Sequence, residues 1–185
     1  MVSAKMDTMV ALVARASGSR MRGNCAYTVI DERLRYLDVA AVEAYAEDAH
    51  LHAGLGMPFP DPLLLARRND FAVNAITSVP DCDDPCRGQV LNYRPRGNRR
   101  EAGWDVYHGL AHGLLARRGV DHSHRDVTAL QFALIATREV IRGMLQTATT
   151  RDVLRALVRR QVHAPTLQIR IRLQQVLAQN LSELL

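Results

Sequence analysis

The amino-acid sequence predicts an α+β fold in which helices predominate. Apolar residues recur at helical spacing in several long segments, whereas only two short runs are typical of strands. The 185 residues suffice for one domain of ordinary size with a small appendage, and 48% hydrophobic with 23% charged residues is an ordinary globular composition. We expect an N-terminal extension over residues 1–34, a main domain over 35–147 and a basic helical region over 148–185.

The elements of the first half follow from apolar spacing and from breaker residues. Residues 35–55 suit an amphipathic helix that stops near the glycines at 54 and 56. A short helix should begin at Pro62, with Asp61 as its N-cap, and end near Asn69. The remaining elements before the next helix are two strands and a basic turn, at residues 71–79, 89–93 and 94–103.

The central stretch, residues 104–115, has a helical pattern that contains His108 and His112. At ~100° per residue, two side chains four positions apart leave the same face of a helix. Both histidines then border the apolar stripe, where a metal ion can sit. The alternative is a pair of partly buried histidines that have satisfied hydrogen bonds and no ligand.

A second helical pattern, from about residue 123 to 145, adds a third possible ligand. Asp126 lies near its start, on the face that carries Ala129 and Ala133, which are small enough for two helices to approach closely. Zinc accepts histidine and carboxylate ligands, and three protein ligands with an open fourth position are typical of catalytic zinc. The sequence therefore predicts zinc bound by His108, His112 and Asp126.

These two segments resemble the ImmA/IrrE-type metallopeptidase domains. The family pattern is His-Glu-x-x-His, a Leu-Leu pair, a short loop, and an acidic residue followed by x-x-Ala-x-x-Phe-Ala. The resemblance covers roughly residues 37–145, with a weaker one to about 178. The matching residues are His108-Gly109-Leu110-Ala111-His112-Gly113-Leu114-Leu115 and Asp126-x-x-Ala129-x-x-Phe132-Ala133.

The resemblance implies a small zincin-like metallopeptidase domain that acts on a DNA-binding repressor in a mobile-element or stress-response setting. Gly109 stands where the family has its catalytic glutamate, and Asp126 where it usually has a glutamate ligand. That glutamate takes a proton from the attacking water and passes it to the leaving amine, and glycine can do neither. We therefore expect a catalytically impaired protein. Gly109 and Gly113 should leave that side of the helix bare, so that a glutamate installed at 109 reaches the water.

Other metal-ligand residue types are weaker candidates. The cysteine count is three, which does not suggest a disulfide framework. Cys82 and Cys86 lie in an acidic loop without a matching second pair, and the neighbouring aspartates disfavour the thiolate. His122 and His124 fall in the loop before the second helix, with Ser123 or His124 near its N-cap. These two histidines are the next ligands to consider if Asp126 does not bind.

The C-terminal region carries the net charge of +5. Residues 138–185 hold eight arginines against three acidic residues, and the rest of the chain is balanced. Helices expected at 149–161 and 166–179 form a helix-turn-helix-like hairpin, which suggests contact with DNA or an acidic protein surface. The alternative is a hairpin that completes the core with solvated arginines. The candidate binding residues are Arg151, Arg155, Arg159, Arg160, Arg170 and Arg172.

Two classes of function follow from these patterns. One is a zinc metallopeptidase-like protein that acts on or binds a repressor, and the other is a non-enzymatic regulatory protein that uses the same fold to bind metal, DNA or a partner. The apolar patch near the N-terminus, residues 9–14, is too short for a signal segment or a bilayer span. We expect a cytoplasmic protein without a membrane contact.

Overall fold

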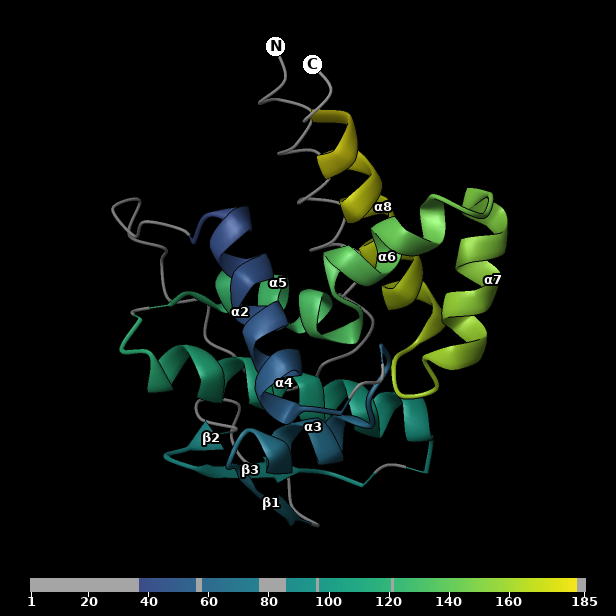
Figure 1. Cartoon of the computed structure of the whole chain (residues 1–185). Helices are drawn as coiled ribbons and strands as arrows, with labels where there is room; N and C mark the ends of the chain where they lie inside the picture. Colours follow the sequence, from purple (N-terminus) through teal and green to yellow (C-terminus); the bar gives the residue numbers. More distant parts are fainter. Residues whose placement is uncertain (1–36, 56–57, 77–85, 96, 121, 183–185) are drawn as a thin grey trace.

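The computed structural model describes residues 37–55, 58–76, 86–95, 97–120 and 122–182. Within this part of the chain the α+β fold dominated by helices is confirmed (Figure 1). None of its helices is long and apolar enough to cross a membrane. The helices are α2 (Val39–Ala53), α3 (Pro62–Arg68), α4 (Arg99–Arg117), α5 (His124–Ile135), α6 (Arg138–Leu145), α7 (Thr150–Arg160) and α8 (Thr166–Ser182), and the strands are β1 (Ala72–Ala75), β2 (Cys86–Arg87) and β3 (Val90–Tyr93).

The three strands form one small sheet of order β1-β3-β2. β1 is parallel to β3, with Ala72 opposite Val90, and β2 is antiparallel to β3. Leu91 of β3 is fully buried while its neighbour Val90 is half exposed, because successive side chains of a strand point to opposite faces. The buried face contacts α4, which lies directly over the sheet in Figure 1.

α4 is the central helix, and it is buried on more than one side. Its core residues contact the sheet, α3 and α5, so the helix lacks the single apolar stripe of a surface helix. It begins at Arg99, where the Asn98 side chain accepts a hydrogen bond from Arg100 N. The predicted basic turn over residues 94–103 is therefore wrong in its second half. The buried apolar residues of α4 are Val106, Tyr107, Leu110, Ala111, Leu114 and Leu115.

The expected helix over residues 123–145 is divided into α5 and α6. Ala136 has extended backbone angles, and the Thr137 side chain caps α6 by accepting from Val140 N. The last carbonyls of a helix have no partner within it, and those of α5 are buried. Side chains from distant segments satisfy them: His50 donates to Leu134 O, Gln161 to Ile135 O and Arg172 to Ala136 O, at 3.0, 2.7 and 3.0 Å.

α7 and α8 form the predicted helical hairpin, and both pack into the same hydrophobic core as α4. Leu157 of α7 and Ile169, Leu173 and Val176 of α8 are buried in that core. The turn between the two helices lies against the start of α4, where a Cβ on Gly103 would overlap the backbone carbonyl of His163. The C-terminal region is thus joined to the main domain by close packing.

Several predicted features lie outside the described residues. These are the N-terminal extension over residues 1–34, the end of the first predicted strand at 77–79, and the acidic loop that contains Cys82. Asp61 does cap α3 as predicted, since its side chain accepts from Leu63 N at 2.8 Å.

Candidate metal centre

Three histidines from two helices converge at one point of the fold. His108 and His112 lie one turn apart on α4, and His124 is the first residue of α5. One ring nitrogen from each lies within 4.8 Å of the others. Ligands of a tetrahedral zinc ion with bonds of 2.0–2.1 Å are about 3.4 Å apart, so modest inward rotation of the imidazoles completes the site. His108 and His112 are half-buried and His124 is exposed, which leaves an open position toward solvent.

His108 is held by a glutamine on the facing helix. Its Nδ1 lies 3.1 Å from Gln131 Oε1, and Gln131 Nε2 donates to Trp104 O at 2.9 Å. Because the amide NH₂ is used on the carbonyl, Oε1 accepts the Nδ1 proton of His108. This leaves Nε2 of His108 with a lone pair for a metal, which is the usual arrangement of a ligating histidine whose other nitrogen is tethered.

His112 is held in the same manner by a fourth histidine, His122. Nδ1 of His122 lies 2.8 Å from Val120 O, and a carbonyl can only accept, so this nitrogen carries the proton. Nε2 of a neutral His122 is then an acceptor, and it lies 3.4 Å from His112 Nδ1. His112 therefore donates from Nδ1 and presents Nε2 as its free lone pair.

Burial keeps the imidazoles of His108, His112 and His124 neutral. It lowers the pKa of His108 to about 4, a shift that the hydrogen bond donated by His108 to Gln131 Oε1 partly opposes. Burial, with the neighbouring histidines, lowers the pKa of His112 to about 3, and burial also lowers the pKa of His124. Metal ligation requires the unprotonated ring, so at neutral pH the three side chains are already in the form that binds a metal.

Asp126, the third ligand predicted from the sequence, is not part of the converging group. Its Oδ2 accepts hydrogen bonds from Ser123 N and Ser123 Oγ at 2.8 and 2.7 Å, and its Oδ1 accepts from Leu37 N at 2.9 Å. The carboxylate therefore completes a capping box at the start of α5. Its place beside the two histidines of α4 is taken by His124, one of the two reserve candidates.

Gly109 is buried between α4 and the sheet. A Cβ at this position would lie 2.8 Å from Leu91 Cδ2 of β3 and 3.1 Å from Leu91 Cγ. The expectation of a bare side of the helix, open to an installed glutamate, is therefore wrong. The glycine allows a close approach of helix and strand, and Leu91 occupies the space that a longer side chain would need.

Five of the six arginines predicted as binding residues are exposed, and Arg172 is not. Arg172 is 2% exposed, and its two terminal nitrogens bind Glu43 of α2 at 2.6 and 2.7 Å. It was predicted as a binding residue from the localised net charge, but it lies about 200° around α8 from the exposed Arg170 and therefore on the buried face of that helix. The five exposed side chains are Arg151, Arg155, Arg159, Arg160 and Arg170.

Sequence reasoning did not identify Gln131 or Leu91 as parts of the site. The available signal for Gln131 was a lone amide within the apolar run 129–135 of a buried helix, since buried polar side chains almost always have a specific partner. Leu91 carried no such signal, because its role depends on which helix covers the sheet.

The chain matches no protein-family model, no curated protein and no solved structure. The functional argument therefore rests on the residues of the site.

Proposed function

We propose that this protein binds zinc through His108, His112 and His124, and that it is a metallopeptidase-like, zincin-like protein that does not hydrolyse peptide bonds efficiently. The observation that carries the proposal is the convergence of three neutral imidazoles, two of which have their second ring nitrogen fixed by a partner. An imidazole set suits zinc, copper, iron or nickel, and zinc is the metal that the resemblance implies.

The donor set fits zinc in number and chemistry. Three protein ligands would hold the ion, and the exposed side of His124 leaves the fourth position accessible. When bound in such a site, zinc acts as a Lewis acid and makes a coordinated water more acidic. Gln131 and His122 orient His108 and His112 and fix which ring nitrogen each presents.

The same geometry supports weak or absent peptide hydrolysis. Among the described residues the converging group contains no carboxylate, the two oxygens of Asp126 accept hydrogen bonds from Ser123 and from Leu37 N, and Leu91 fills the space beside Gly109. Peptide hydrolysis needs a group that accepts a proton from water and delivers it to the leaving nitrogen, and this general acid–base contribution is worth about 10²–10⁴ in rate. We propose that the site has a binding or regulatory role.

The proposed partner is a repressor-type DNA-binding protein, as the resemblance implies. The alternative is a non-enzymatic regulatory protein that binds DNA or another acidic partner through the exposed arginines of α7 and α8. The observation that favours it is the localisation of five exposed arginines on these two helices. Both proposals allow a cytoplasmic protein. In the first the three histidines are essential, and in the alternative the exposed arginines of α7 and α8 are essential.

The test is a zinc titration of the chelator-treated full chain against a competing chromogenic chelator. We expect one zinc per chain, with affinity lowered more than about 100-fold in His112→Ala, since a structural zinc site contributes roughly 10–16 kcal/mol over its ligands. His52→Ala is the matched control, because His52 is an exposed histidine of α2 that pairs with Asp70. Equal zinc binding by all three proteins would overturn the proposed site.

A peptidase assay on an unfolded protein and on a repressor-type substrate completes the test. We expect no zinc-dependent cleavage by the unmodified chain. Robust cleavage that requires zinc and disappears in His108→Ala would show that another residue serves as the base, and the proposal of an impaired enzyme would be abandoned.

A further inference from the structure

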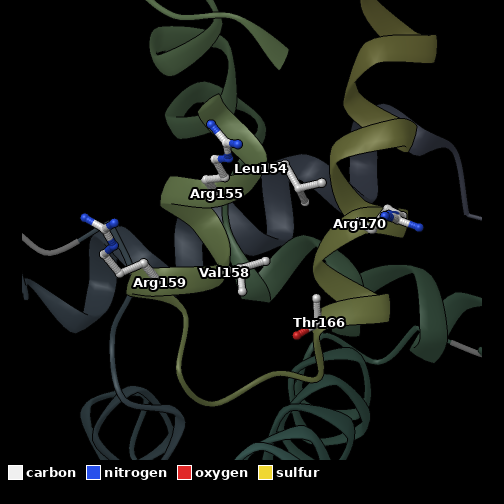
Figure 2. A pocket seen from close by; sticks show the side chains of 6 residues that line it. All are labelled: Leu154, Arg155, Val158, Arg159, Thr166 and Arg170. Carbon is white, nitrogen blue, oxygen red and sulfur yellow. The ribbon is translucent and has the colours of Figure 1, made fainter. Parts of the chain in front are cut away.

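A groove lies between α7 and α8, at the end of the molecule where the exposed arginines gather. Its volume is about 510 Å³. Figure 2 shows Leu154 and Val158 projecting from α7 toward the side of α8, with arginines on both helices and Thr166 at one end. The groove therefore has an apolar floor, formed by Leu154 and Val158, and basic flanks, whose Arg159 and Arg170 side chains point outward from the two helices in Figure 2.

The apolar floor and the basic flank on α7 both follow from helical spacing. Leu154 and Val158 are four residues apart and lie on one face of the helix, partly buried against the core. Arg155 and Arg159 repeat the same spacing one position later and are exposed. Arg170 lies at the opposite edge on α8, so arginine side chains flank the groove on two helices.

These charges have few partners within the protein. Arg155 lies 3.6 Å from Asp152, an exposed pair one turn apart on the same helix. Arg159 and Arg170 have no ion pair within the described part of the chain, and no acidic side chain described here lines the groove. The lining residues therefore carry a net positive charge, and the exposed ion pair of Arg155 contributes little to holding that side chain in place.

We propose that the groove binds an acidic amphipathic helix of a partner protein. Two apolar side chains of that helix, three or four residues apart, would contact Leu154 and Val158, and flanking carboxylates would pair with Arg155, Arg159 and Arg170. The volume accommodates a few large side chains but not a whole helix, as expected when one face of a helix docks into a groove. Arginine is enriched at such interfaces because its planar group binds carboxylates with two hydrogen bonds.

Charge complementarity alone also fits the phosphate backbone of nucleic acid, and the apolar floor decides between the two. A phosphate surface is bound by basic, hydroxyl and backbone N–H groups. Leu154 and Val158 would face charged phosphates without benefit, whereas an amphipathic helix buries them at about 25 cal/mol per Å² of apolar area.

The test uses the full chain and fluorescence anisotropy with three probes. The first is a synthetic helix with leucines on one face and glutamates beside them, the second has lysines in place of the glutamates, and the third is a duplex DNA oligonucleotide. We expect the acidic helix to bind with a Kd below about 100 µM and the basic helix to bind at least roughly tenfold more weakly. Failure of the acidic helix to bind in this range would overturn the proposal.

Two charge-matched double variants locate the site. Arg159→Glu with Arg170→Glu alters the groove, and Arg151→Glu with Arg160→Glu alters exposed arginines of α7 that do not line it. We expect the first pair to weaken binding of the acidic helix about tenfold or more, and the second pair to change it less than about threefold. Equal losses in both would show diffuse attraction and contradict a groove.

A floor variant separates the two classes of partner. Leu154→Ser, with folding verified by its melting curve, should weaken the acidic helix severalfold and leave any DNA affinity unchanged. DNA that binds more tightly than the acidic helix at the same salt concentration, with no response to Leu154→Ser, would assign the surface to nucleic acid and overturn the proposal.

Discussion

The histidine end of the molecule, formed by α4 and α5, differs from the arginine end, formed by α7 and α8, in how its polar groups are held. His108 and His112 are half-buried, and each has one ring nitrogen committed to a neighbouring side chain. Arg159 and Arg170 are exposed to solvent beside the groove between α7 and α8. The histidines are organised before any ligand arrives, whereas no side chain within the described part of the chain fixes Arg159 or Arg170 by an ion pair.

This difference separates two kinds of binding. A preorganised set of neutral donors suits a small ion that demands fixed geometry, and little ordering is lost when it binds. Long charged side chains lose rotamer freedom on binding, so they suit a large partner that repays this cost with apolar contact. Arg172 stands between the two cases, since it lies on α8 with the exposed Arg170 but is held by Glu43 and Ala136 O as firmly as the histidines are held by their partners.

The first prediction concerns this buried arginine. Arg172→Met should destabilise the protein by about 3–5 kcal/mol, because it leaves the carboxylate of Glu43 buried without a counter-charge. It also removes the hydrogen bond to Ala136 O at the end of α5. The free energy of unfolding from chemical denaturation measures the loss.

The matched control for this prediction is the exposed Arg170→Met, expected within about 0.5 kcal/mol of the unmodified chain. The double variant Glu43→Met with Arg172→Met should recover most of the lost stability, since no unpaired charge remains. A double variant as unstable as Arg172→Met alone would contradict this account of the ion pair.

The second prediction is a loss of stability of the metal-free protein in mild acid. An unfolded histidine titrates near pH 6.5, whereas the folded chain holds the pKa of His108 at about 4 and that of His112 at about 3. As the pH falls below 6.5, the unfolded state binds more protons than the folded state, so stability is complete above that pH and decreases toward pH 4. His50, whose pKa burial also lowers, acts in the same direction.

Chemical denaturation in the presence of a chelator, at about pH 7.5 and about pH 5, should show a loss of roughly 2–4 kcal/mol, with His112 discounted for its partial exposure. His108→Gln with His112→Gln should flatten this part of the profile. Equal or greater stability at the lower pH would contradict the assignment of neutral, buried histidines.

The third prediction tests the packing of Gly109 against Leu91. Gly109→Ala should destabilise by about 1–2 kcal/mol, since overpacking costs about 1–3 kcal/mol and outweighs a gain in helix propensity of up to about 1 kcal/mol. In a Leu91→Ala background the same substitution should be neutral or stabilising. A double-mutant cycle measures the coupling, and additive effects would show that the two residues do not compete for space.

Local signals were sufficient to predict much of the fold. Apolar spacing located α2, α7 and α8, and Asp61 followed by Pro62 located the start of α3. The break between α5 and α6 was not predictable in this way, because residues 123–145 continue a helical pattern across it. What stabilises the break is tertiary: side chains from α2, α8 and the turn between α7 and α8 satisfy the carbonyls that the end of α5 exposes.

The site shows the same division between local and tertiary information. Spacing alone placed His108 and His112 together on one face of α4. Choosing His124 over Asp126 as the third ligand required the geometry at the start of α5, and the sequence contained a local signal for that choice. Ser123 followed three residues later by an acidic residue is the pattern of a capping box, which commits the carboxylate to backbone N–H groups.

The most direct test of the account is therefore to substitute His124 and Asp126 separately and to measure the zinc affinity of each variant. His124→Ala should lower the affinity of the chain for zinc more than about 100-fold, as expected for loss of one of three ligands. Asp126→Asn should leave zinc affinity within about threefold, while costing about 1 kcal/mol of stability through the weakened cap. The opposite outcome, zinc binding lost in Asp126→Asn and retained in His124→Ala, would contradict the three-histidine centre.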